Sequence, residues 1–207
     1  MDIPPKSLKS RFPIWTCLIL GLSIISYALP QVSSALIYDR VAIFEGEVWR
    51  LLSSHLVHFT KLHLFYNLMA FGVAGWIIES RGYQHFVLLC LLMAVFIGIF
   101  LLMMKPDMNY YGGLSGLASG SIYYLALFGL REPQPWRLMC IVTLFLVPIK
   151  IFLEIDMSQS IFAYSAPFSL VPLSHIIGCL VALFLFFAIK FHENRQRTLL
   201  NHEHSIH

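Results

Sequence analysis

Long apolar runs, separated by short polar links, dominate the sequence. A helix that crosses a bilayer needs about 20 mostly apolar residues, and several runs are close to that length. These runs predict helices over residues 12–29, 62–78, 84–104, 113–130, 138–153 and 172–191. The fifth run contains Pro148 and Lys150, which interrupt its apolar character. The pattern therefore predicts an all-α integral membrane protein with six transmembrane helices.

Polar segments at the two ends of the chain set the expected domain boundaries. The first apolar run follows a basic start and could be taken for a signal peptide, but no small-residue cleavage site clearly follows it. Because further spans follow, we interpret it as the first helix of one membrane domain over residues 12–191. We expect residues 1–11 to be a cytoplasmic segment and residues 192–207 a solvated, partly disordered cytoplasmic tail.

The distribution of positive charge predicts the orientation in the membrane. Cytoplasmic loops carry an excess of Lys and Arg. Placing both termini in the cytoplasm puts most of the 14 Lys and Arg residues on that side. Residues 30–50 then lie on the outer side, where their mixture of charged residues with Trp and Tyr suits a structured loop in the membrane interface.

Composition narrows the possible functions further. The chain is 58% hydrophobic and only 12% charged, and a soluble domain carries about twice that share of charge. The net charge of +3 comes without a basic block, so no nucleic-acid partner is expected. The four cysteines lie inside apolar runs, where they are expected to be buried thiols rather than a disulfide framework.

A few polar side chains are predicted at membrane depth, where they are costly and usually mark function. Ser115 opens the fourth run within a glycine-rich stretch, and His175 lies near the outer end of the sixth run. His63 and Asn67 are four residues apart, so they share one face of the second helix.

Small residues predict which helices pack together. Gly116 and Gly120 are four apart in the fourth run, and Gly178 and Ala182 are four apart in the sixth. Small residues at this spacing allow two membrane helices to approach closely. Packing of these two faces against each other would bring the two helices that carry Ser115 and His175 together.

This set of side chains suits nucleophilic catalysis. A serine hydroxyl attacks a carbonyl only when a base removes its proton, and a histidine within hydrogen-bond reach is the usual base. His63, Asn67 and backbone N–H groups near Ser115 could stabilise the resulting oxyanion. No Asp or Glu is predicted at the depth of His175, so the residues read as a Ser–His dyad.

Simpler interpretations exist for each feature. The glycine-rich stretch alone could be a helix-packing motif, His175 could be satisfied by a carbonyl, and His63 with Asn67 could be an inter-helix hydrogen-bonding pair. His55, His58 and His63 do not share one helical face, so we expect no metal site, and nothing in the sequence implies a cofactor.

Three separated motifs resemble the signatures of rhomboid intramembrane serine proteases. They are Gly113-Leu114-Ser115-Gly116, then His58 with His63 and Asn67, and then Ser174-His175-Ile176-Ile177-Gly178. Their order, their spacing and the six-span layout also match, over residues 12–191. The resemblance implies a rhomboid-like six-helix bundle with Ser115 as nucleophile and His175 as general base. It also implies an oxyanion and substrate site at His63, Asn67, Gly113, Leu114 and the Ser115 amide.

One position departs from this family pattern. Rhomboids often carry an aromatic ring four residues after the nucleophile, which packs against the catalytic histidine. This chain has Ser119 there. The orientation of His175 must therefore come from another part of the molecule.

A narrower resemblance points to rhombosortases, a bacterial rhomboid subfamily. It rests on residues 38–43, 46–52, 55–58 and 150–154. It implies a multi-pass protein of the bacterial inner membrane whose active site opens to the periplasm. Its substrates would be secreted, membrane-anchored proteins that end in a Gly-Gly pair, a membrane helix and a basic cluster.

Other functions stay open at this point. A general rhomboid protease would cleave single-span proteins without such a sorting tail. A catalytically inactive rhomboid-like protein would instead hold client proteins in the membrane. A small-solute transporter fits less well, because no inverted repeat or pair of broken helices is evident.

Overall fold

The computed structural model describes residues 11–156 and 171–204, with side chains up to residue 199. The expected N-terminal segment up to residue 10 and residues 157–170 lie outside this part of the chain. The elements are α1 (Ile14–Ala28), α2 (Pro30–Leu36), β1 (Tyr38–Asp39), α3 (Arg40–Phe44), α4 (Arg50–Ser53), the 3-10 helix η1 (Ser54–Leu56), α5 (Lys61–Ser80), α6 (Phe86–Met104), β2 (Tyr110–Tyr111), α7 (Ser115–Gly129), α8 (Trp136–Asp156) and α9 (Pro172–His204). The two short strands pair antiparallel, with Tyr38 opposite Tyr111.

The protein is a multi-pass membrane bundle built almost entirely of helices. Each of the predicted apolar runs forms a helix: α1 and then α5 to α9. Within the described residues, four helices are long and apolar enough to cross a membrane: α5, α6, α8 and α9. The pair α1 and α2, bent by 113°, is a fifth candidate if it counts as one span. The all-helical membrane class is thus confirmed, and the number of six spans stays a prediction.

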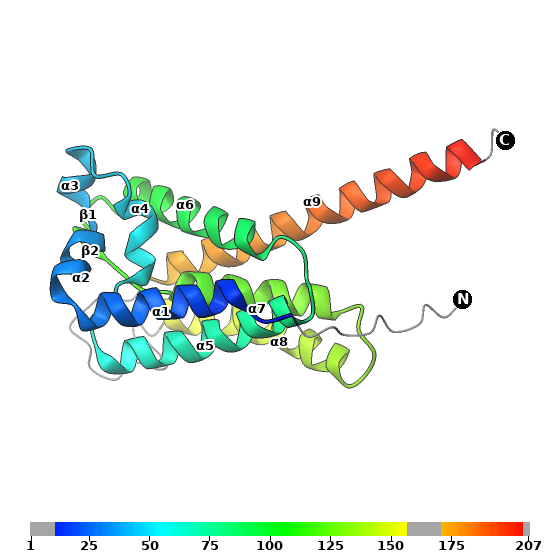
Figure 1. Ribbon diagram of the computed structural model, residues 1–207, viewed down its shortest axis with the longest axis horizontal. Helices are drawn as coiled ribbons and strands as arrows, with labels where there is room; N and C mark the ends of the chain where they lie inside the picture. The colour runs from blue at the N-terminus through cyan, green and yellow to red at the C-terminus, as the bar shows by residue number, and fades with distance from the viewer. Residues whose placement is uncertain (1–10, 157–170, 205–207) are drawn as a thin grey trace.

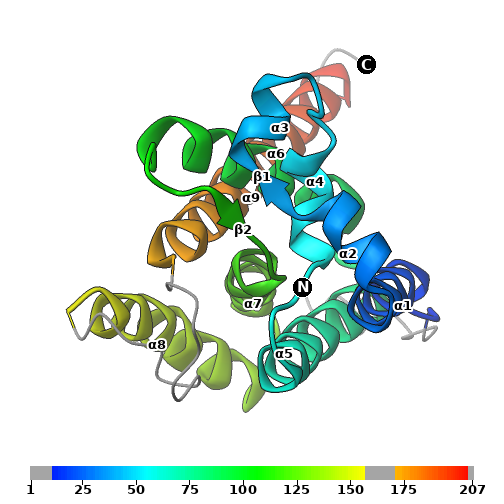
Figure 2. The same ribbon diagram turned by 90° about the vertical axis from the view of Figure 1, so that its left-hand side faces the viewer.

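The central helix is α7, which is only 15 residues long. Figure 2 shows it in the middle of the bundle, with α5, α8 and α9 around it and α1 on the outer side of α5. Most of its residues are buried by protein. Because other helices rather than lipid surround α7, this helix need not be long enough to cross the full thickness of a bilayer.

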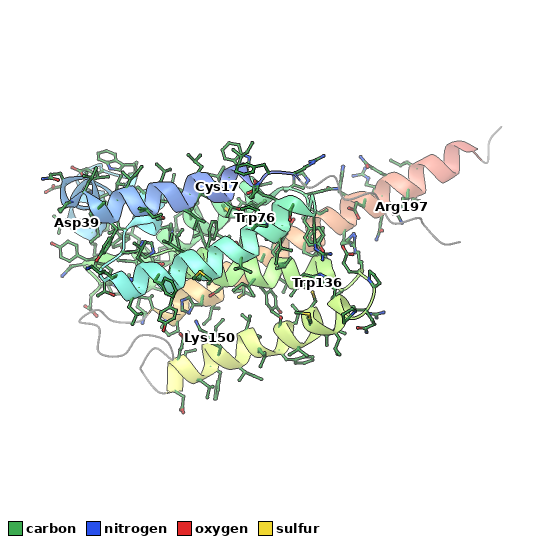
Figure 3. The ribbon with its side chains drawn as sticks, turned by 60° about the horizontal axis from the view of Figure 1, so that its bottom comes forward. Cys17, Asp39, Trp76, Trp136, Lys150 and Arg197 are labelled. Atoms are coloured by element: carbon green, nitrogen blue, oxygen red, sulfur yellow. The ribbon has the colours of Figure 1, made fainter. Side chains whose placement is uncertain are left out.

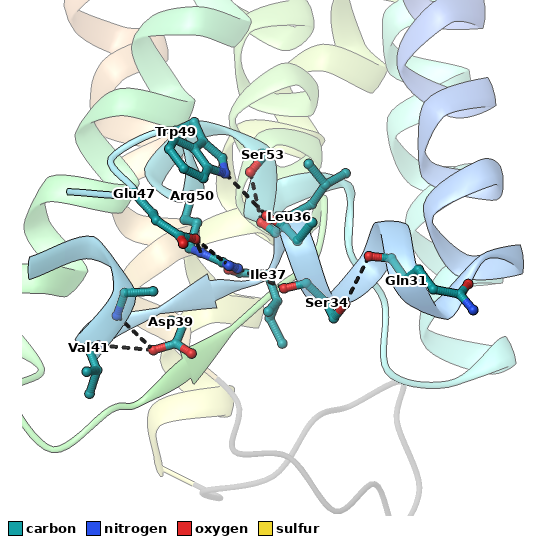
Figure 4. A network of polar contacts seen from close by, with 12 residues as sticks. Gln31, Ser34, Leu36, Ile37, Asp39, Val41, Glu47, Trp49, Arg50 and Ser53 are labelled. Carbon is teal, nitrogen blue, oxygen red and sulfur yellow. Dashed lines mark hydrogen bonds and ion pairs between the residues drawn. The ribbon is translucent and has the colours of Figure 1, made fainter. Parts of the chain in front are cut away.

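A dense polar network holds the segment between α1 and α5 (Figure 4). The Arg50 guanidinium donates through Nη1 to the carbonyls of Ser34 and Ile37, at 2.8 and 2.9 Å. It also forms an ion pair with Glu47 at 2.6 Å. The Asp39 carboxylate caps α3 by accepting from the N–H groups of Val41 and Ala42, in the first turn of that helix. The expectation of a structured segment is confirmed, and its place in the membrane interface stays a prediction.

Helix α1 is capped by a side chain from another helix. The Glu79 carboxylate, near the end of α5, accepts from the N–H groups of Trp15 and Thr16 at 3.1 and 2.8 Å, and from the Thr16 hydroxyl at 2.7 Å. A helix N-terminus has free N–H groups and a partial positive charge, so a carboxylate is stabilising there. This contact ties the start of α1 to the end of α5.

The expectation of a partly disordered tail is wrong for the described residues, because α9 continues as a helix to His204. Figure 1 shows α9 extending beyond the bundle, toward the same end at which α1 begins. Residues 192–204 contain no Gly or Pro and are rich in good helix formers. Side-chain contacts along the helix also support it, among them Lys190 with Glu193 at 2.5 Å and His192 with Gln196 at 3.0 Å.

Candidate functional site

Ser115 is the first residue of α7 and follows a tightly constrained turn. Gly113 has φ +130°, a region that side chains rarely adopt, and a Cβ there would lie 2.8 Å from the His63 ring. The turn is fixed from outside by two hydrogen bonds. The Gly113 N–H donates to the Ser54 carbonyl at 3.2 Å, and the Leu114 N–H donates to His58 Nε2 at 3.4 Å.

These two bonds engage the N–H groups of Gly113 and Leu114 within the protein. The expected role of these two residues in stabilising the oxyanion or the substrate stays a prediction. Their contribution is to shape the turn and to let the His63 ring approach. The first intrahelical bond of α7 runs from the Ala118 N–H to the Leu114 carbonyl, at 2.7 Å. Among the described residues, the N–H groups without a partner at this end of α7 therefore begin with Ser115, and such groups favour negative charge.

His58 stabilises the turn only as a neutral ring. Its Nδ1 lies 3.2 Å from the Leu56 carbonyl and its Nε2 accepts from Leu114, so the proton is on Nδ1. Burial, with the nearby His63 ring, lowers the pKa of His58 to about 3. Burial also lowers the pKa of the neighbouring His55 to about 4. Both rings are therefore neutral near neutral pH.

Helices α7 and α9 pack with their backbones in contact, as the small residues predict. A Cβ added at Gly178 would overlap the Gly116 carbonyl, and one added at Gly120 would lie 2.5 Å from the Gly178 carbonyl. A Cβ at Gly116 would lie 3.0 Å from the Ser174 carbonyl oxygen. Because Ser174 precedes His175 in the chain, this contact places His175 at the level of the start of α7.

One cavity brings the predicted site residues together. It has a volume of about 1170 Å³ and lies between α5, α7, α8 and α9. Ser115, His175, His63 and Asn67 all line it. Ser115 is half-buried, and the His175 side chain is only 4% exposed. The side chains of Ser115 and His175 thus line the same cavity.

The α5 side of the cavity carries polar groups. Thr60 caps α5 by accepting from the His63 N–H at 3.1 Å, which fixes the start of this helix beside the Gly113 turn. Asn67 is buried, and its Nδ2 has no hydrogen-bond partner among the described residues. A buried amide donor without a partner is unusual in a folded protein, and here it belongs to a cavity-lining side chain.

The structure adds an acid that sequence reasoning missed. The Glu154 carboxylate, on α8, is 2% exposed, and its Oε2 lies 2.9 Å from His175 Nδ1. The same oxygen lies 2.9 Å from Lys150 Nζ, one helical turn earlier on α8. The expectation that no Asp or Glu lies near His175 is therefore wrong. The reason is that α8 continues through Pro148 to Asp156, so Glu154 is on a helix and not in the loop where the sequence pattern placed it.

These features define a class: a helical, multi-pass membrane protein whose central helix presents a serine to a cavity shared with a buried histidine. The family model named Rhomboid domain matches residues 45–191. The chain belongs to the rhomboid family.

Curated relatives agree with this family. The chain is 29% identical over 116 residues to the proteins named rhomboid protease GlpG from Salmonella newport, Salmonella enteritidis PT4 and Salmonella typhi. Each match covers 56% of this chain and 41% of the relative. The chain thus spans about two-fifths of the length of these relatives.

Proposed function

We propose that this protein is an intramembrane serine protease in which Ser115 is the nucleophile and His175 the general base. The observation that carries the proposal is the shared cavity of these two side chains, at a point where the backbones of α7 and α9 touch. Membership of the rhomboid family supports the same function.

The chemistry begins with the Ser115 hydroxyl. As its Oγ attacks the substrate carbonyl carbon, its proton passes to His175 Nε2. The carbonyl oxygen becomes an oxyanion, which the Ser115 N–H at the start of α7 is placed to stabilise together with the side chains of Asn67 and His63. His175 then gives the proton to the leaving amine, and water hydrolyses the acyl-enzyme by the reverse transfers.

The proposed substrates are membrane-anchored proteins with a C-terminal helix. A peptide bond inside a helix must be unwound before its carbonyl can be attacked, and glycine is a poor helix former. A Gly-Gly pair before the helix would therefore ease cleavage. The rhombosortase-like segments, among them residues 46–52 and 150–154, support this substrate class and a place in the bacterial inner membrane with the site facing the periplasm.

The test is cleavage of a purified reporter with a Gly-Gly tail, by the protein in detergent or vesicles. We expect Ser115→Ala to abolish cleavage. The matched control is Ser121→Ala on the same helix, because Ser121 is buried, its Oγ has no hydrogen-bond partner among the described residues, and it is not one of the described residues that line the cavity. Cleavage by Ser115→Ala at the unmodified rate would overturn the proposal.

A second reporter separates the substrate classes. Replacing the Gly-Gly pair by Leu-Leu in the same tail should reduce cleavage at least tenfold if the tail is recognised as proposed. Equal cleavage of both reporters would identify a general rhomboid protease. Absence of cleavage with either reporter, together with absence of labelling by a fluorophosphonate, would identify an inactive client-binding protein.

A further inference from the structure

Glu154, on α8, faces His175. Glu154 Oε2 is 2.9 Å from His175 Nδ1 and 2.9 Å from Lys150 Nζ. Figure 3 shows Lys150 on α8, the helix at one edge of the bundle. Ser115, His175, Glu154 and Lys150 all line the same cavity.

Two groups contact His175 Nδ1, and the shorter contact indicates the state of the ring. Glu154 Oε2 lies at 2.9 Å and can only accept, which calls for the proton on Nδ1, whereas Lys150 Nζ lies at 3.3 Å and would need a lone pair there. The shorter, better-formed contact with the carboxylate favours the proton on Nδ1. The other nitrogen, Nε2, then carries a lone pair. That is the tautomer a general base needs in order to take a proton from a serine hydroxyl.

We propose that Glu154 is a positioning residue that holds His175 in this tautomer and orientation, so that Ser115, His175 and Glu154 act together as a triad. This inference rests on the proposed function. It also answers how His175 is held, because position 119, one turn after Ser115, carries only the small side chain of serine.

Lys150 completes the arrangement. A buried carboxylate without a partner is costly, and Glu154 is 2% exposed. Lys150 shares the Glu154 oxygen and is itself 28% exposed, so its ammonium compensates the carboxylate while keeping contact with the cavity. The carboxylate therefore does not depend on a charged imidazole, and His175 is left free to gain and release a proton.

The proton balance needs no other group. The Ser115 O–H bond breaks as the proton moves to His175 Nε2, and the new imidazolium is stabilised by Glu154 through Nδ1. The same proton leaves for the amine of the departing fragment. Glu154 remains a carboxylate and Lys150 remains an ammonium throughout.

The main experiment compares Glu154→Gln with Glu154→Asp and with Asp156→Asn, an exposed acid on the same helix. The glutamine amide can donate to Nδ1 and so favours the wrong tautomer. We expect kcat to fall about 100-fold to 10,000-fold, as when the acid of a serine-protease triad becomes an amide. KM should change less than about threefold. Glu154→Asp should recover part of kcat, and Asp156→Asn should behave as the unmodified protein.

A second measurement does not depend on the variants folding. NMR of the histidine ring nitrogens in the unmodified protein, with the His175 signals identified by their loss in His175→Ala, reports which nitrogen carries the proton. We expect the proton on Nδ1. A proton on Nε2, or a kcat of folded Glu154→Gln within threefold of the unmodified protein, would overturn the role of Glu154.

The two proposals fail in different ways. If Ser115→Ala cleaves normally, the proposed function is wrong whatever the ring tautomer. If Ser115→Ala is inactive and Glu154→Gln is fully active, the protease stands and the triad is wrong.

Discussion

The contact between α7 and α9 differs in kind from the contact between α8 and α9. In the first, glycines bring two backbones together, and a Cβ at Gly178 would overlap the Gly116 carbonyl. In the second, the polar atoms of Lys150, Glu154 and His175 meet at the edge of a cavity. Close packing sets the level at which the two helices meet, and polar contacts set how the His175 ring is turned. The first contact should therefore tolerate no added atom, whereas the second can be replaced with the fold intact when both charges, those of Lys150 and Glu154, are removed together.

The largest effect is expected from breaking the packed contact. Gly178→Ala should lower the free energy of unfolding by about 3 kcal/mol, the upper part of the range for overpacking, because the new methyl group meets backbone rather than a flexible side chain. It should also abolish cleavage. Thermal unfolding in detergent and the reporter assay measure the two effects.

Gly21→Ala is the control for this prediction. A Cβ at Gly21, on α1, would meet nothing within 4 Å. We expect unchanged unfolding and cleavage. A Gly178→Ala protein as stable as Gly21→Ala would show that α7 and α9 are not packed through their glycines.

The next largest effect is expected at the polar contact of Lys150 and Glu154 with His175, where stability and activity can be measured separately. Lys150→Met leaves the buried Glu154 without its ammonium, and removal of one partner of a buried ion pair costs about 3–5 kcal/mol. Because Lys150 is partly exposed, we expect the lower end of that range and about a tenfold loss of kcat. The double variant Lys150→Met with Glu154→Leu should regain stability but not kcat.

The free energy of unfolding and the kcat of these variants show whether Lys150 and Glu154 serve the fold alone or also the reaction. A double variant that regains both would mean that the polar group serves only the fold. A double variant that regains stability alone supports a role for Glu154 in the reaction.

The smallest effect concerns the turn before Ser115 and depends on pH. The pKa of His58 is lowered to about 3 in the folded protein, against about 6.5 for an unperturbed histidine. As pH falls from about 6.5 toward 3, the unfolded chain binds a proton that the folded ring does not, so stability decreases. The slope is at most about 1.4 kcal/mol per pH unit for this residue.

The variant His58→Gln tests whether His58 causes this loss of stability at low pH. Unfolding is followed between pH 7 and pH 4, because this range lies mostly between the unperturbed pKa of histidine and the lowered pKa of His58. Glutamine does not titrate, so the acid slope should become shallower. Some slope should remain, because His55 has a pKa lowered to about 4 and titrates in the same direction. An unchanged slope would contradict the assignment of a neutral His58.

The sequence predicts the helices and the packed contact well, because both depend on local patterns. Apolar runs predict α1 and α5 to α9, and small residues four apart predict the α7–α9 contact. The sequence does not predict that α7, with 15 residues, is shorter than a usual transmembrane span. The sequence shows that a residue is apolar but not whether lipid or protein covers it.

The polar part of the site was less predictable, because its partners are far apart in the chain. Pro148 and Lys150 suggested an interrupted fifth run, whereas α8 continues and places Glu154 one turn after Lys150. The spacing of four between Lys150 and Glu154 was the available signal. Nothing local could show that the N–H groups of Gly113 and Leu114 donate to Ser54 and His58, which come more than fifty residues earlier.

The most direct test of the central claim is to map the adduct of a fluorophosphonate on the purified protein by peptide mass spectrometry. A serine made nucleophilic by a neighbouring base reacts with such a probe, and ordinary serines do not. The account predicts one adduct, on Ser115, which is lost in His175→Ala. An adduct on another serine, or the same labelling of Ser115 without His175, would contradict it.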